Sequence, residues 1–260
     1  MKQRTITAVV LIALLVPIVY IGGMPFSILI SILSVMATYE LLHICDRPKC
    51  KVYLYILISL YMLYILYFSS GILVDSSAII ILLLVLYACS IFDETISLLR
   101  LGYYFSGSVL ISVGLLSIYY LRMYYGFSYL VLLLFATLGA DTGAYLFGKA
   151  FGKHKLIPRL SPNKTIEGSI GGIFLGSVLS IGYALIIDLS IALPQLVIIC
   201  IILTMTGQIG DLTFSNMKRT FEVKDFSHLL PGHGGILDRF DALLFNGAVL
   251  GLLLSLVSVI

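Results

Sequence analysis

The feature that most constrains this chain is a series of apolar runs, each long enough to cross a bilayer. A hydrocarbon core about 30 Å thick needs about 20 apolar residues in a helix. Such runs must satisfy their own backbone hydrogen bonds in lipid, which predicts α-helices. The sequence therefore predicts an all-α integral membrane protein of about nine transmembrane helices, near residues 5–22, 25–43, 52–70, 77–92, 103–121, 127–147, 169–188, 192–213 and 241–259.

The composition also places the chain in a bilayer. Hydrophobic residues make up 60% of the sequence and charged residues 11%, and the mean hydropathy is +1.10. This leaves too little polar surface to cover a soluble protein of 260 residues. The runs leave no room for a separate soluble domain, so we expect residues 1–260 to form a single polytopic membrane domain. The first run follows Met1 and Lys2 without a small-residue cleavage site, which favours a retained helix over a signal peptide.

The placement of positive charge predicts the orientation. Of the 16 Lys and Arg residues, all but Arg122 fall in segments on the same side as the N-terminus in this layout. Cytoplasmic loops carry such an excess, so the N-terminus is predicted to be cytoplasmic, in the inner (cytoplasmic) membrane of the cell. The net charge of only +3 and the lack of a basic tract argue against nucleic acid as a partner.

Two predicted cytoplasmic loops, 148–168 and 214–240, combine Gly, Pro, His and both signs of charge. The eighth run leads into the second loop with polar residues that share about 100° of one helix face, namely Gln208, Asp211, Ser215, Lys218 and Arg219. Asp211 lies near the membrane boundary, where a carboxylate needs a compensating cation or metal. The alternative is a contact network within the helix, in which Asp211 pairs with Lys218 or Arg219.

The segment before the last run has the composition of an anion and metal site. Pro231 and its neighbouring glycines can bring backbone N–H groups close to a phosphate. Asp238 and Asp241 share a helix face at i, i+3 spacing. We therefore predict a phosphate and divalent-metal site at the head of a helix, with a flexible loop capped by Asp238 as the alternative.

Further candidates lie around the first polar loop. Asp141 follows an almost purely apolar run, and it either lines the site or stabilises helix contacts. Ser161 or Thr165 is placed to cap the seventh helix, and Lys164 to reach a phosphate. Small residues at four-residue spacing, Gly168, Gly172 and Gly176, predict close helix packing within one protomer or between two.

With these features the sequence resembles a known family, the phosphatidate cytidylyltransferases, also called CDP-diacylglycerol synthases. The resemblance covers residues from about 139 to 247 and includes the family's long C-terminal signature. The matching segments are Asp141–Tyr145, Gly148–Lys149, Phe151–Lys155, Ser161–Gly168, Gly210–Leu212, Ser215, Lys218–Arg219, Lys224–Asp225, Leu230–Gly235 and Asp238–Asp241. The first half, 1–125, is similar only in being hydrophobic, so 126–260 is expected to be the catalytic half.

The resemblance implies a membrane enzyme, commonly dimeric, that condenses CTP with phosphatidate into CDP-diacylglycerol and pyrophosphate. Asp211 and Asp238 are similar to the family's metal-binding aspartates, and Asp241 is a further candidate ligand. We expect Mg²⁺, with a second metal or a monovalent cation as an addition. The residues predicted to act in catalysis are Asp211, Asp238, Lys218 and Arg219. Those predicted to bind substrate are Asp141, Ser161, Lys164, Thr165, Ser215, Lys224, His233, Gly234, Gly235 and Arg239.

The site is expected at the cytoplasmic membrane boundary, because phosphatidate keeps its acyl chains in lipid while CTP arrives from water. Two other classes of function stay open at this stage. One is a CTP-dependent lipid kinase or an ether-lipid cytidylyltransferase. The other is an ion-coupled transporter, but a transporter predicts polar residues near mid-membrane, whereas here they gather on one side.

Overall fold

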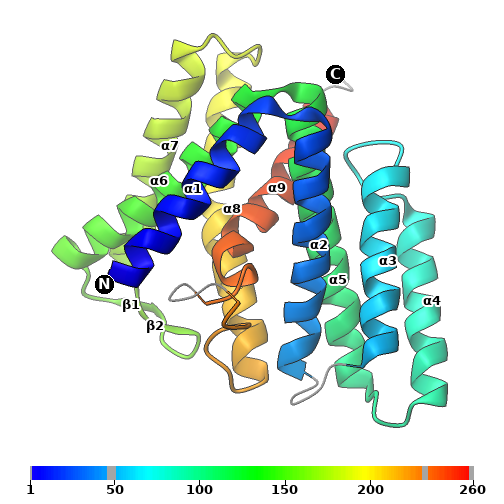
Figure 1. The fold of residues 1–260 in the computed structure, drawn as a ribbon. Coiled ribbons are helices and arrows are strands. Elements are labelled where there is room, and N and C mark those ends of the chain that lie inside the picture. The colour runs from blue at the N-terminus through cyan, green and yellow to red at the C-terminus, as the bar shows by residue number, and fades with distance from the viewer. Residues whose placement is uncertain (1, 46–50, 230–233, 258–260) are drawn as a thin grey trace.

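The computed structural model describes residues 2–45, 51–229 and 234–257, and it is mostly helical. Figure 1 shows helices that run up and down through the molecule, with one small sheet. In chain order the elements are α1 (Lys2–Ile21), α2 (Gly23–Cys45), α3 (Val52–Phe68), α4 (Ser76–Phe92), α5 (Leu98–Tyr120), a π-helical turn (Leu121–Tyr125), α6 (Phe127–Phe151), β1 (Lys155–Ile157), β2 (Ser161–Thr165), α7 (Ile166–Ile186), α8 (Leu193–Thr220) and α9 (Leu237–Val257).

Six of the described helices are long and apolar enough to cross a membrane: α2, α5 with its π-helical turn, α6, α7, α8 and α9. This agrees with the prediction of a multi-pass helical membrane protein. The apolar helices α3 and α4 have 17 residues each. At 1.5 Å per residue they are about 25 Å long, slightly less than a typical hydrocarbon core.

One local element differs from the all-α prediction. Strands β1 and β2 form an antiparallel hairpin in which Lys155 pairs with Thr165 and Ile157 with Ser161. Sequence patterns missed it because the strands have only three and five residues and bury little apolar surface. Ser161 precedes a proline, which disfavours the helical conformation and favours an extended backbone.

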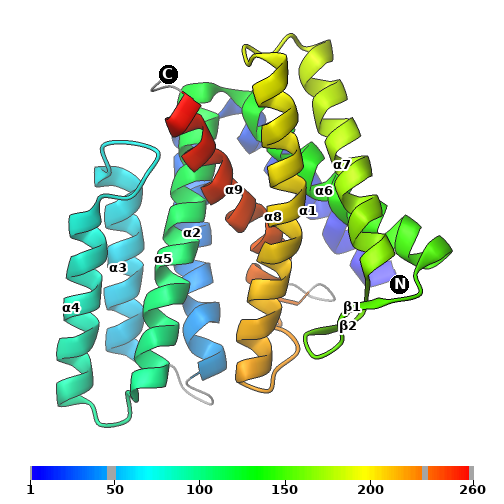
Figure 2. The same ribbon diagram turned by 180° about the vertical axis from the view of Figure 1, so that it is seen from behind.

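The polar segments predicted to lie on one side do gather at one end of the molecule. The hairpin, the C-terminal end of α2 and the segments 221–229 and 234–236 all lie at the bottom of Figure 1, and the reverse view in Figure 2 agrees. We call this the polar end. It therefore brings together parts of the chain that are far apart in sequence.

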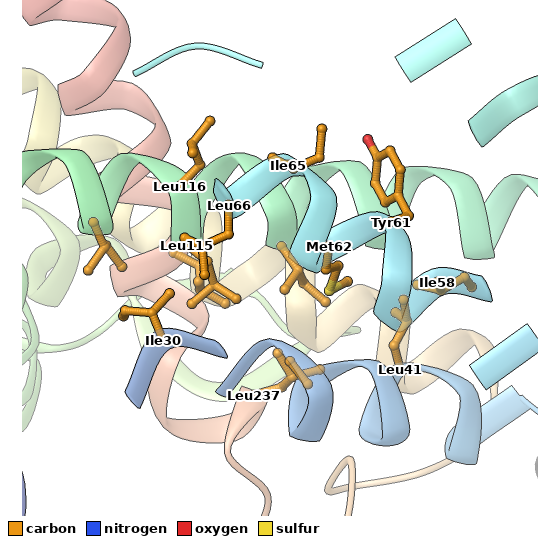
Figure 3. Packing of buried hydrophobic residues seen from close by; sticks show 14 of the residues in the cluster. Ile30, Leu41, Ile58, Tyr61, Met62, Ile65, Leu66, Leu115, Leu116 and Leu237 are labelled. Carbon is orange, nitrogen blue, oxygen red and sulfur yellow. The ribbon is translucent and has the colours of Figure 1, made fainter. Parts of the chain in front are cut away.

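The main hydrophobic core lies between α2, α3, α5 and α9, as Figure 3 shows. Leu41 from α2, Met62 from α3, Leu115 from α5 and Leu237 from α9 are almost completely buried. The first half of the chain thus supports the start of α9, which carries Asp238.

The glycine face of α7 packs against α6 within the same chain. A Cβ added to Gly172 would lie 2.6 Å from the carbonyl oxygen of Ala140, and one added to Gly176 would lie 2.8 Å from the Ala140 nitrogen. Only glycine permits this approach. Of the two packing alternatives, the one within a protomer is the one that the structure contains.

Candidate active site

One alternative predicted that Asp211 pairs with Lys218 or Arg219 within α8. The structure contains a different pairing. Asp211 forms an ion pair with Lys164, which lies on β2. The Asp211 and Lys164 side chains are 27% and 29% exposed, so the pair remains open to solvent or ligand. The contact joins the hairpin to α8.

A second ion pair joins α8 to α9. Lys218 Nζ lies 2.6 Å from Asp238 Oδ1, and the two side chains are only 11% and 5% exposed. The other oxygen of Asp238 accepts hydrogen bonds from the backbone N–H groups of Phe226, at 2.9 Å, and Gly235, at 3.0 Å. The Lys218 ammonium also lies 5.4 Å from the ring centre of Phe226. Asp238 thus holds α8, the preceding segment and α9 together.

Asp241 is linked electrostatically to both of these ion pairs. It interacts electrostatically with Lys164 and Lys218, and also with Asp238. Asp141 interacts with Lys164 and Asp241. Four carboxylates and two ammonium groups therefore make up what we call the central cluster: Asp141, Asp211, Asp238, Asp241, Lys164 and Lys218. Fully ionised, the cluster carries two more negative charges than positive ones.

A cavity of about 230 Å³ opens beside the central cluster, between α6, the hairpin, α7 and α8. The residues that line it include Asp141, Tyr145, Asn163, Lys164, Thr165 and Gln208. The side chain of Asp141 is exposed and lines this cavity. The cavity is large enough for a small polar group and is continuous with charged side chains.

Two local interactions shape the walls of this cavity. Thr165 accepts a hydrogen bond from the Gly168 N–H at 3.1 Å and caps α7, as one of the sequence alternatives proposed. Gln208 Oε1 accepts from the Ser169 hydroxyl at 2.5 Å, and Gln208 Nε2 donates to the Ser169 carbonyl at 3.1 Å. This reciprocal pair fixes α7 against α8.

The environment of Lys164 changes its proton affinity. Burial lowers the pKa of the Lys164 ammonium from its usual value, while Asp141 and Asp241 act in the opposite direction. An additional anion that approaches this lysine would stabilise its charged form and raise its pKa.

Several predicted site residues lie apart from the cavity lining. Arg219 is exposed and donates from Nη1 to the Val223 carbonyl at 3.1 Å, which turns it toward its own loop. Ser161 sits in the strand pairing of β2, and Ser215 is half-buried on α8. Lys224 and Arg239 are exposed at the polar end.

The predicted glycine segment is described only in part. His233 lies outside the described residues. Gly234 has φ +83°, a left-handed conformation that favours glycine. Its neighbour Gly235 donates its N–H to Asp238, so this amide is held by protein in the structure.

The structure adds one residue that the sequence reasoning did not select. Glu40, on α2, is completely buried and accepts three hydrogen bonds at the polar end. The donors are the Ser227 hydroxyl at 2.6 Å, the Ile236 N–H at 2.8 Å and the Leu237 N–H at 2.7 Å. The sequence could have indicated this residue, because Glu40 is the only acidic residue in the apolar run 25–43. An ionisable residue inside a membrane span points to a function by default.

The central cluster fits a hard divalent cation whose coordination is completed by other ligands. Carboxylate oxygens are the donors that Mg²⁺ prefers, and Mg²⁺ commonly uses one or two of them together with water and substrate phosphates. Among the described residues, no group of three or more His, Cys, Asp or Glu side chains forms a ready-made site. The excess negative charge is compatible with a cation that arrives with a phosphate ligand.

Comparison with known proteins gives matches over almost the whole chain. The model of the cytidylyltransferase family matches residues 2–257. The chain is 37% identical to the phosphatidate cytidylyltransferase of Bacillus subtilis (strain 168) over 271 residues, which cover 99% of each chain. It is 35% identical to the enzymes of that name from Staphylococcus saprophyticus and Staphylococcus aureus (strain COL), over 98% of this chain and 99% of theirs.

Proposed function

Given that the chain belongs to the cytidylyltransferase family, we propose that it transfers the cytidylyl group of CTP to phosphatidate, giving CDP-diacylglycerol and pyrophosphate for phospholipid biosynthesis. The observation that carries this function is the full-length match to relatives named for the reaction. The chain is thus a nucleotidyltransferase and a membrane enzyme.

The position of the central cluster suits the two substrates. Phosphatidate is anchored by its acyl chains, and CTP is dissolved in water, so their phosphates must meet at the headgroup level. The central cluster includes Lys164 from the hairpin, which lies at the polar end, and Asp238 and Asp241 from the start of α9. We propose that this end is cytoplasmic, in the inner membrane, and that α1, α3 and α4 also span, which makes nine spans.

Both reactants are polyanions, so the site must supply positive charge before a phosphatidate oxygen can approach the α-phosphorus of CTP. Lys164 and Lys218 supply two ammonium groups, but each is already paired with an aspartate. We propose that a substrate phosphate displaces Asp211 from Lys164. The exchange takes place at the Lys164–Asp211 pair because this pair is partly exposed. Opening the buried Lys218–Asp238 pair would cost more free energy, since it would leave a buried charge without its partner.

Asp211, once released from Lys164, would hold Mg²⁺ together with Asp238 and Asp241. When bound, Mg²⁺ neutralises phosphate charge and stabilises the attacking and leaving oxygens of an in-line displacement. The chain's own residues hold and orient the phosphates. No general base is needed, because a phosphate monoester is already ionised near neutral pH.

The remaining candidates take part in substrate binding or catalysis in this proposal. They are Asp141, Ser161, Thr165, Ser215, Lys218, Arg219, Lys224, His233, Arg239 and the amides of Gly234 and Gly235. We also propose a homodimer. Its interface lies outside the glycine face of α7, because α6 already covers that face.

The test is a micelle assay with purified protein, phosphatidate, Mg²⁺ and CTP labelled either at the α-phosphate or at the γ-phosphate. Label from the α-phosphate is expected in the lipid phase as CDP-diacylglycerol, and it should depend on phosphatidate and disappear with chelator. Transfer of the γ-label to a lipid alcohol would instead identify a CTP-dependent lipid kinase and overturn the proposal. A synthetic ether-linked phosphatidate, offered in competition, tests the lipid class.

A further inference from the structure

We propose that Glu40 is a positioning residue for cytidylyl transfer, which sets the backbone turn at the start of α9 and thereby the orientation of the Asp238 carboxylate. The inference rests on the proposed function. It assigns a role in the catalytic half to a residue of α2, in the half of the chain that carries few polar motifs.

The turn before α9 presents three consecutive backbone N–H groups, and two carboxylates divide them. Asp238 accepts from Gly235 at 3.0 Å, while Glu40 accepts from Ile236 at 2.8 Å and Leu237 at 2.7 Å. The first amides of a helix have no partner within the helix and attract anions. Since Glu40 takes two of the three, Asp238 accepts from the remaining one, in addition to the Phe226 N–H and the Lys218 ammonium.

Glu40 also fixes the segment from a second direction. Its Oε1 accepts the Ser227 hydroxyl at 2.6 Å, and this serine lies directly after Phe226, whose N–H donates to Asp238. The two carboxylates therefore both bind the same two short segments of the chain, 226–227 and 235–237. Displacing Glu40 would shift both segments relative to Asp238.

The packing around Glu40 is tight enough to transmit such a shift. Its side chain is 0% exposed, and a Cβ added to Gly235 would lie 2.8 Å from both of its carboxylate oxygens. Tyr103 donates to the carbonyl of Leu41 at 2.9 Å, which anchors the adjacent turn of α2 to α5. The turn of α2 next to Glu40 is thus fixed to α5, so Glu40 can orient the groups that it binds.

Glu40→Gln is the sharpest substitution, because it keeps the size of the side chain and removes its charge. All three partners of Glu40 are donors, so one position of the glutamine amide would face an N–H or O–H with its own NH₂ group. Ser227→Ala is a milder variant that removes one of the three donors to Glu40, and with it the acceptor of the Leu229 N–H. Ser34→Ala is the matched control, because Ser34 is equally buried on α2 and its hydroxyl donates within that helix, to the Ile30 carbonyl.

Two readouts separate positioning from general stability. The first is the Mg²⁺ concentration for half-maximal rate, which we expect to rise by about 10- to 100-fold in Glu40→Gln, as for other residues that orient metal ligands. The second needs no activity: hydrogen–deuterium exchange at the amides of Ile236 and Leu237 should be faster in Glu40→Gln. Ser227→Ala should move both in the same direction by less, and Ser34→Ala should move neither.

An unchanged Mg²⁺ dependence in Glu40→Gln and Ser227→Ala, with a lower rate only in proportion to folded protein, would overturn the positioning role. If Glu40→Gln does not fold, Ser227→Ala alone decides the question. The failure of the proposed function looks different, because wild-type protein would then form no labelled CDP-diacylglycerol, or Asp238→Asn would retain full activity.

Discussion

The buried ion pair between Lys218 and Asp238 makes a quantitative prediction for Lys218→Met. The substitution leaves the Asp238 carboxylate, 5% exposed, without the ammonium that lies 2.6 Å from it. Removing one partner of a buried pair costs about 3–5 kcal/mol, because a charge remains buried and uncompensated. For a chain of this size 1 kcal/mol corresponds to about 2–4 °C, so the midpoint of thermal unfolding should fall by roughly 6–20 °C.

The assay is thermal unfolding of purified protein in detergent, with Lys224→Met as the control. Lys224 is exposed near the same loop, and its loss should change stability by at most about 0.5 kcal/mol. The double variant Lys218→Met/Asp238→Asn removes both charges while keeping an acceptor for the amides of Phe226 and Gly235. It should be more stable than Lys218→Met alone, yet inactive.

Two results would refute this reasoning. One is a Lys218→Met protein that unfolds within a degree or so of the Lys224→Met control. The other is a double variant whose loss of stability equals the sum of the two single losses, because residues in direct contact should instead show an interaction energy of about 0.5–3 kcal/mol.

Three further predictions address the site, the packing and the loops. Asp211→Asn should abolish CDP-diacylglycerol formation but leave a folded, extractable protein, and near-normal turnover would remove Asp211 from the metal site. Gly172→Val should destabilise the protein by about 1–3 kcal/mol, because its Cβ meets a carbonyl oxygen of α6 at 2.6 Å, whereas Gly182→Ala on the same helix, with nothing within 4 Å, should be tolerated. The hydrogen bond from Lys51, with others, holds the pKa of Asp93 well below its usual 3.8. Its stabilising contribution is therefore present above that value and lost as pH falls, so Asp93→Asn should unfold at a lower temperature than wild type near neutral pH and approach it in acid.

The helical architecture could be predicted because each apolar run must form its own hydrogen bonds in lipid. The capping role of Thr165 was also accessible, since a hydroxyl before a helix has few other local partners. Which carboxylate pairs with which ammonium was not. Helix geometry placed Asp211 and Lys218 on one face, but their partners, Lys164 and Asp238, come from β2 and α9.

The separate positions of Lys218 and Arg219 show a limit of such patterns. Consecutive residues on a helix point about 100° apart, and α8 ends at Thr220. Lys218 is buried against Asp238, whereas Arg219 turns outward to the Val223 carbonyl. Glu40 was missed for a different reason: its partners lie at the other end of the chain, and no local spacing relates them.

The link between Glu40 and α9 also has a consequence for how the protein is made. The three donors to Glu40 follow it by 187, 196 and 197 residues, so α2 is synthesised and inserted long before any of them exists. Chains are built from the N-terminus, and a buried ionisable group is costly without partners. A copy cut short before residue 227 keeps this carboxylate unsatisfied. The three hydrogen bonds of Glu40 are therefore complete only once the start of α9 has been made.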